Sequence, residues 1–335
     1  MDLFENPFYL LGISTRSTRE EIMDAAEGAS LSGEPDKVAE AASALSSPRK
    51  RLSAEIFFLP GLDKAGAQRL LAAYRKPVTR VEPCERVYAL TAVNLTAAAL
   101  LRLQGSGWAM TAYAVGLLSK AFESADANSS MAAVNADRRL AGLPAVPSVS
   151  DVEEELDKLR LYCREVVKGA LDRLPSRDLV EAAAQIVRSE TDFGRRPPPV
   201  LVRDLMEIYD LESRAFFDRE EATAKALCGA LKAAAADRGQ PRKAMAVADD
   251  LEKVLFNWQS VAAPLLTFLK STGVTHKPSF SVARDVRDAA VDIHNAGWDP
   301  ALAKKVTSIL ARAFADVAEV SEIAAEDAKR LAGGR

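Results

Sequence analysis

Histidine and cysteine are scarce in this chain of 335 residues. It has two histidines and three widely spaced cysteines, Cys84, Cys163 and Cys228. No Cys-x-x-Cys pair and no His-Glu-x-x-His segment occurs, so the sequence indicates neither a metal site nor a disulfide framework. We expect a reducing, cytoplasmic compartment. His276 is expected in a loop between helices, and His294 near a helix end, where the helix dipole favours it.

Sequence motifs for catalysis and cofactor binding are also missing. There is no Gly-x-Ser-x-Gly, Walker A or dinucleotide-binding glycine pattern. The Gly-Ser-Gly triplet at 105–107 lacks the lysine of a phosphate-binding loop and favours a turn between helices. We therefore expect no catalytic residue, no cofactor and no enzyme, although distant helices could still assemble a pocket.

The chain has neither a long apolar run nor a strong charge. Its most apolar stretch, 87–118, is interrupted by Asn94, Arg102 and the 105–107 triplet, so each half is too short to span a bilayer. A buried helical hairpin is expected there. The formal net charge of −3 gives no general attraction to nucleic acid or to an anionic membrane. The N-terminus lacks the basic and apolar regions of a signal peptide. We expect a soluble protein with no nucleic-acid partner and no membrane insertion.

Helical spacing of apolar residues is what the chain does have. Near the C-terminus such residues recur every three or four positions on one face, which indicates an amphipathic helix. Asp299 as N-cap and Pro300 at the first helical position predict its start. No stretch alternates with a period of two, so the sequence predicts an all-α fold. The apolar face consists of Leu302, Val306, Ile309, Ala313, Phe314, Val317, Val320 and Ala324.

Further helix starts are predicted from capping patterns. Thr18 with Glu21, and Ser150 with Glu153, fit the capping box, in which the hydroxyl and the carboxylate each accept a backbone N–H. Ser47 before Pro48 predicts another cap. Pro241 should open a long helix, and Pro264 should kink it or begin a new one.

Proline and glycine also predict linkers at 76–83, 142–150 and 194–199. These linkers suggest three parts, which are a small N-terminal domain (1–76), a helical middle region (84–193) and a C-terminal helical region (200–335). With no repeat of fixed period, the later parts should form an irregular multi-helix array. The amphipathic C-terminal helices could pair within one chain or between chains, which leaves the oligomeric state uncertain.

Four segments near the N-terminus carry a resemblance to a known family. They are Asn-Pro-Phe-Tyr-Leu-Leu-Gly-Ile (6–13), Thr-Arg-Glu-Glu-Ile (18–22), Glu-Pro-Asp-Lys (34–37) and Ala-Leu-Ser-Ser-Pro-Arg-Lys-Arg-Leu (44–52). In this order they resemble a J domain, the module of DnaJ-type cochaperones, over about residues 4–60. The resemblance implies a compact set of short helices whose loop at 34–37 contacts a DnaK-type chaperone. Segments 257–264 and 289–295 are similar to helical extensions of uncharacterised bacterial J-like proteins.

This N-terminal stretch departs from the family in two ways. The family loop is His-Pro-Asp, whereas Glu34 precedes Pro35 and Asp36 here; glutamate accepts hydrogen bonds only, but imidazole can also donate. The family's second helix is basic, whereas residues 18–45 contain seven acids and two bases, a net charge of −5. This charge would repel an acidic partner surface. Weak or absent stimulation of a chaperone ATPase is the consequence we expect.

Two sets of residues are therefore predicted to bind a partner. The resemblance assigns the loop Glu34, Pro35, Asp36 and Lys37, although this segment could merely be a turn in which Asp36 caps the next helix. The basic run Arg49, Lys50 and Arg51 is the second candidate, with a solvated helix face as the alternative.

The function expected from these features is that of a non-catalytic J-like cochaperone or adaptor. Its partner would be a DnaK-type chaperone or another protein. The alternative is a helical scaffold or assembly protein with no link to a chaperone.

Overall fold

The computed structural model describes residues 1–31, 34–236, 241–297, 300–315, 317, 320 and 326. These residues form fourteen helices and no strand, apart from one isolated parallel bridge between Val78 and Leu103. The predicted all-α fold is confirmed. No helix in these ranges combines the length and the apolar character that crossing a membrane requires.

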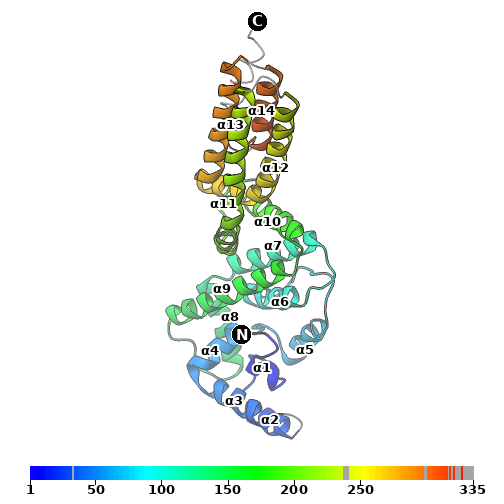
Figure 1. Cartoon of the computed structure of the whole chain (residues 1–335). Helices are drawn as coiled ribbons and strands as arrows, with labels where there is room; N and C mark the ends of the chain where they lie inside the picture. The colour runs from blue at the N-terminus through cyan, green and yellow to red at the C-terminus, as the bar shows by residue number, and fades with distance from the viewer. Residues whose placement is uncertain are drawn as a thin grey trace. The chain divides into compact units, whose positions relative to one another are not determined.

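Contacts divide the chain into two compact units. Unit 1 consists of Met1–Ile186 and Pro199–Leu205, and unit 2 of Val187–Pro198 and Met206–Arg335. Figure 1 shows the course of the chain through the helices of both. The helices that begin in unit 1 are α1 (Pro7–Leu10), α2 (Arg19–Ser30), α3 (Pro35–Ser46), α4 (Pro48–Ile56), α5 (Lys64–Ala73), α6 (Ala89–Arg102), α7 (Trp108–Ser124), α8 (Ala127–Leu140), α9 (Val149–Asp172), α10 (Ser176–Glu190) and α11 (Val200–Ala236). Unit 2 takes in most of α11 together with α12 (Pro241–Thr272), α13 (Lys277–Asn295) and α14 (Pro300–Ala313).

The apolar core of the N-terminal helices extends past the predicted linker at 76–83. Phe8, Leu45 and Leu71 share one buried cluster with Leu95 and Ala98 of α6. The three-part division made from the linkers stays a prediction, but contacts group residues 1–186, which include the first part and most of the second, in one unit. The short N-terminal helices bury too little apolar surface by themselves. Helix α6 adds the apolar side chains that complete their core.

Some predicted helix starts are confirmed and others are wrong. The capping box at Thr18 and Glu21 is formed. At α9 the cap is Ser148, whose side chain accepts from the amide of Ser150. Ser150 therefore lies inside the helix and cannot cap it, because a cap residue needs extended backbone. Ser47 occupies the N-cap position of α4 but makes no side-chain cap hydrogen bond.

The prolines act largely as helix starts. Pro241 opens α12 and Pro300 opens α14, as predicted. No new helix begins at Pro264, because α12 continues through this residue. The Pro264 ring is buried in the core of unit 2. Asp299 and Ala324 lie outside the described residues. The helix ends earlier than the predicted apolar face, because α14 stops at Ala313 and a turn follows at 314–315. Phe314, Val317 and Val320 beyond its end are nevertheless buried.

The stretch predicted as a buried hairpin consists of α6 and α7, which pack against each other. Most of α6 is buried, including the polar residues Thr91, Asn94 and Thr96. Gly105 in the connecting turn has φ +65°, a conformation that glycine adopts without strain.

The core of unit 2 surrounds Trp258. Figure 1 shows α11 to α14 lying alongside one another. The Phe217 ring of α11 lies 4.8 Å from the Trp258 ring and 5.3 Å from the His276 ring, between centroids. The Trp258 indole N–H donates to Ser279 Oγ at 2.9 Å, and that oxygen lies 2.7 Å from His276 Nδ1. His276 stands between α12 and α13, as predicted, and is only 6% exposed.

Burial lowers the pKa of His276, and the nearby Asp210 partly opposes this shift. The unfolded chain therefore binds more protons than the folded one as the pH falls below the ordinary histidine pKa of about 6.5. We expect unit 2 to lose stability over that range. Thermal unfolding at a series of pH values should show the decline, and His276→Gln should flatten it. His294, exposed in the last turn of α13, gives the control: a decline abolished by His294→Gln instead would contradict the assignment.

Candidate functional site

The predicted loop residues are on the surface. Glu34, Pro35, Asp36 and Lys37 are all exposed, and Pro35 is the first residue of α3. Glu34 occupies the N-cap position without a side-chain cap hydrogen bond. Its carboxylate pairs instead with Lys37 Nζ at 2.5 Å, and this hydrogen bond raises the pKa of Lys37. Asp36 lies within the first turn, so it does not serve as the cap that the alternative required.

Helix α2, which precedes the loop, packs against α3 and presents an acidic surface. Ile22 is its only buried residue, whereas Glu20, Asp24 and Glu27 are exposed. Two large apolar side chains accompany these acids, Met23 at 51% exposure and Leu31 at 91%. An acidic surface with protruding apolar side chains suits a partner that combines basic and apolar groups.

The predicted basic patch is not one surface. Arg51 is only 4% exposed, so its inclusion among the partner-binding residues is wrong. It lies on the inner face of α4, one helical turn before Glu55, and pairs with that carboxylate. Lys50 is exposed, and Arg49 pairs at the surface with Glu154 of α9 at 2.7 Å.

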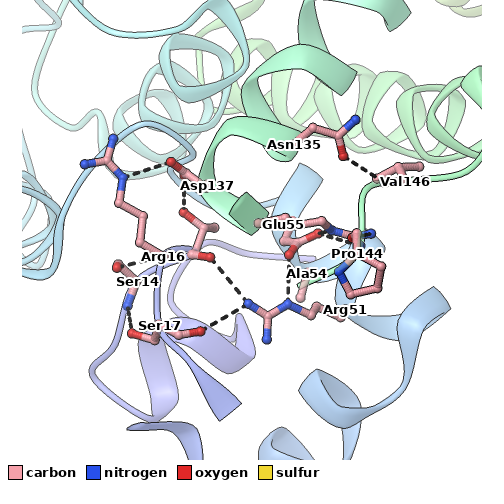
Figure 2. A network of polar contacts seen from close by, with 12 residues as sticks. Ser14, Arg16, Ser17, Arg51, Ala54, Glu55, Asn135, Asp137, Pro144 and Val146 are labelled. Atoms are coloured by element: carbon pink, nitrogen blue, oxygen red, sulfur yellow. Dashed lines mark hydrogen bonds and ion pairs between the residues drawn. The ribbon is translucent and has the colours of Figure 1, made fainter. Parts of the chain in front are cut away.

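The side chains that the structure does bring together are buried and charged. Arg51 Nε donates to one oxygen of Glu55 at 2.8 Å, and Arg138 of α8 donates to the other oxygen at 2.8 Å. The Arg51 guanidinium also approaches the carbonyls of Thr15 and Ser17, each at 3.4 Å. Figure 2 shows this chain of contacts running from the turn at 14–17 through α4 to α8. Burial raises the pKa of Glu55, while Arg138 and Arg51 act against that shift.

Asp137 makes the second connection between the N-terminal turn and α8. Its carboxylate accepts from Thr15 Oγ1 at 2.6 Å, from Arg16 Nε at 2.8 Å and from the Gly61 amide at 2.6 Å. Its side chain is 2% exposed, and these three donors satisfy it. Adjacent residues of one helix therefore hold two separate segments of the N-terminal region.

Two asparagines make comparable links through the backbone. Asn6 caps α1 by accepting from Phe8 N, and its Nδ2 donates to the carbonyls of Ala54 and Phe57. Asn94 of α6 donates to the carbonyl of Ile56 at 2.8 Å. The Asn-Pro opening that contributes to the family resemblance thus acts here by joining α1 to the end of α4.

No group of three or more metal-ligating side chains occurs in the described ranges. Cys84, Cys163 and Cys228 are free thiols, and burial raises the pKa of each. Elevated thiol pKa values disfavour the reactive thiolate. The described residues of the predicted loop thus offer exposed polar groups that a partner could contact. The buried charged network holds the helices beneath that loop in place.

Comparisons of the chain with protein-family models, with curated proteins and with solved structures gave no match. The resemblance to the J domain therefore depends on the four N-terminal sequence segments alone.

The buried network should be essential for the stability of unit 1. Arg138→Met leaves the Glu55 carboxylate buried with one guanidinium instead of two, and breaking a buried pair costs about 3–5 kcal/mol. We expect the free energy of unfolding, measured by urea denaturation, to fall by a corresponding amount. Amide hydrogen exchange in α4 and α8 should become faster.

Arg49→Met is the matched control, because the Arg49–Glu154 pair is exposed. It should change the free energy of unfolding by about 0.5 kcal/mol or less. Equal losses from the two arginine variants would show that the buried network has no special role.

Proposed function

We propose that the N-terminal region is a J-like docking module, and that the protein is a non-catalytic cochaperone or adaptor. The module binds a DnaK-type chaperone through α2 and the loop at Glu34–Lys37, and it stimulates ATP turnover weakly or not at all. The observation that carries this proposal is the exposure of Glu34, Pro35 and Asp36 at the start of α3, next to the packed helix α2.

The support beneath the loop favours a docking role. Helix α3 packs against α1 and α4, and α4 is fixed to α8 by Glu55 and Arg138. A partner that grips the loop therefore meets helices whose positions are already set. Preorganisation of this kind reduces the conformational entropy lost on binding.

The charges on α2 determine what the partner must offer. Exposed acids steer the module toward a basic surface and away from an acidic one. With glutamate in place of the family histidine, the loop also lacks an imidazole donor beside Pro35 and Asp36. The partner chaperone must therefore offer a basic docking surface, and the missing imidazole accounts for the weak or absent effect on ATP hydrolysis.

Asp36→Asn should weaken chaperone binding about tenfold, because a charged hydrogen-bonding group contributes roughly 1.5–3 kcal/mol. The experiment titrates the full chain into a DnaK-type chaperone and follows binding and ATP turnover together. Wild-type protein should bind and leave turnover nearly unchanged.

Asp151→Asn provides the matched control, since Asp151 is also an exposed aspartate in the first turn of a helix, α9. It should leave binding unchanged. The chaperone proposal fails if the wild-type chain neither binds nor alters turnover, or if both variants behave alike.

A scaffold or assembly protein without a chaperone link is the second candidate. The acidic face of α2 favours it, because its sign is opposite to that of the family's second helix. In that case another protein with a basic surface occupies the same face.

Exchanging Glu20, Asp24 and Glu27 for their amides should remove most of the salt dependence of partner binding, since screening acts on exposed charges. Crosslinking in cells with the wild-type and triple-amide chains, read by mass spectrometry, tests this outcome. A non-chaperone complex that is lost in the triple variant supports the scaffold. Partners recovered equally with both chains would mean that this face is not used.

A further inference from the structure

Unit 2 contains a cavity of about 830 Å³ that neither the core nor the proposed docking module explains. It is bounded by the end of α10 and the turn after it, by the second half of α12, by the loop before α13, and by Ala315 and Val317 after α14. Cavities of this size hold small organic molecules. The lining residues used below are Arg188, Phe193, Leu266, Lys270, Val274 and His276.

The charged side chains that the structure describes in this cavity have one sign. Arg188 and Lys270 line it, and none of the described lining residues is acidic. Arg188 is half-buried and Lys270 is exposed. Neither cation has an ion pair with a carboxylate among the described residues. Two cations without a described counter-ion, in a cavity of mixed polar and apolar lining, favour an anionic ligand.

The backbone at the cavity edge is strained. Asp192 and Phe193 have φ values of 49° and 56°, which are uncommon for residues other than glycine and costly for a bulky one. The Phe193 amide donates to the Arg188 carbonyl at 2.9 Å, and the Gly194 amide donates to Thr191 Oγ1 at 2.9 Å. Strain of this kind persists only where the surroundings impose it, and it often occurs at ligand sites.

Gly194 is needed where this turn meets α12. Its φ is +80°, and an added Cβ would lie 3.0 Å from the Thr267 carbonyl and 3.1 Å from the Lys270 side chain. The turn therefore fits closely against the helix that supplies Lys270. This fit leaves the Phe193 ring 60% exposed at the cavity edge, where an apolar ligand group could cover it.

His276 adds a hydrogen-bonding group to the same wall. The Ser279 hydroxyl accepts from the Trp258 indole and lies 2.7 Å from His276 Nδ1. Burial lowers the pKa of His276, in keeping with the neutral form.

We propose that this cavity binds a small amphipathic acid, an anionic carboxylate attached to an apolar chain or ring. Arg188 and Lys270 bind the carboxylate, and Phe193, Leu266 and Val274 contact the apolar body. The site lies wholly in unit 2, so it does not depend on the function proposed for the N-terminal region.

Octanoate is a suitable probe, with octan-1-ol as its uncharged counterpart. The full chain has two histidines, so imidazole NMR signals report on the cavity directly. At about pH 8, above the ordinary histidine pKa of about 6.5, octanoate should shift the His276 signal saturably and leave that of His294 in place. Octan-1-ol should bind at least tenfold more weakly.

Lys270→Gln and Arg188→Gln should each weaken octanoate binding about tenfold, the size of one charge-assisted hydrogen bond. Two variants are used so that misfolding of one, detected by circular dichroism, leaves the other decisive. Lys304→Gln is the control, because Lys304 is exposed in α14 and does not line the cavity. It should leave octanoate binding unchanged.

Several outcomes would overturn the proposal. They are the absence of a saturable shift with octanoate, equal binding of octan-1-ol, and binding that every lysine and arginine variant retains. A His276 shift that follows protein concentration without octanoate would mean that a second copy of the chain fills the cavity. That result would also overturn the amphipathic acid as the ligand.

Discussion

The arrangement of unit 1 depends on one buried carboxylate with two guanidiniums. Glu55 lies between Arg51, four residues earlier on the same helix, and Arg138, on a helix 83 residues further along the chain. A buried carboxylate without such partners would be costly, so α4 and α8 are bound to the same geometry. Asp137, the residue before Arg138, is a second buried carboxylate, and it holds the turn at 14–17 against α8 by accepting hydrogen bonds from Thr15 and Arg16. The positions of α4 and of the turn at 14–17 therefore depend on carboxylates that solvent hardly reaches.

The helical architecture could be predicted because its signals are local. Spacing of apolar residues, the Thr18 capping box and prolines at helix starts act within one or two turns, and the structure places helices where they indicated. Ser150 shows the limit of such patterns, because Ser148, two residues earlier, competes for the same role and takes the cap. Pro264 shows another, since tertiary burial keeps it inside a helix that local preference would interrupt. The packing of α6 into the N-terminal core required contacts that no local pattern contains.

In the candidate site, too, features set by local sequence could be predicted and features set by tertiary contacts could not. Exposure of the loop at 34–37 could be anticipated, because a polar turn between two amphipathic helices has no core to enter. The run at 49–51 could not be read as one surface, since a helix turns about 100° per residue and Arg51 faces inward. The four-residue spacing of Arg51 and Glu55 was visible in the sequence, yet it is equally typical of exposed pairs. Nothing near Asp137 or Arg138 marks them as partners of residues some 80 to 120 positions earlier. The cavity of unit 2 likewise joins residues of α10, α12, the loop before α13 and the segment after α14.

The 83-residue separation of Glu55 and Arg138 has a consequence for synthesis of the chain. At a translation rate of about 5–20 residues per second, roughly 4 to 17 s pass between the addition of one residue and the other. During that interval the nascent N-terminal helices lack the guanidinium that allows the carboxylate to be dehydrated. The buried contact between α4 and α8 can therefore form only after the middle of the chain has been synthesised.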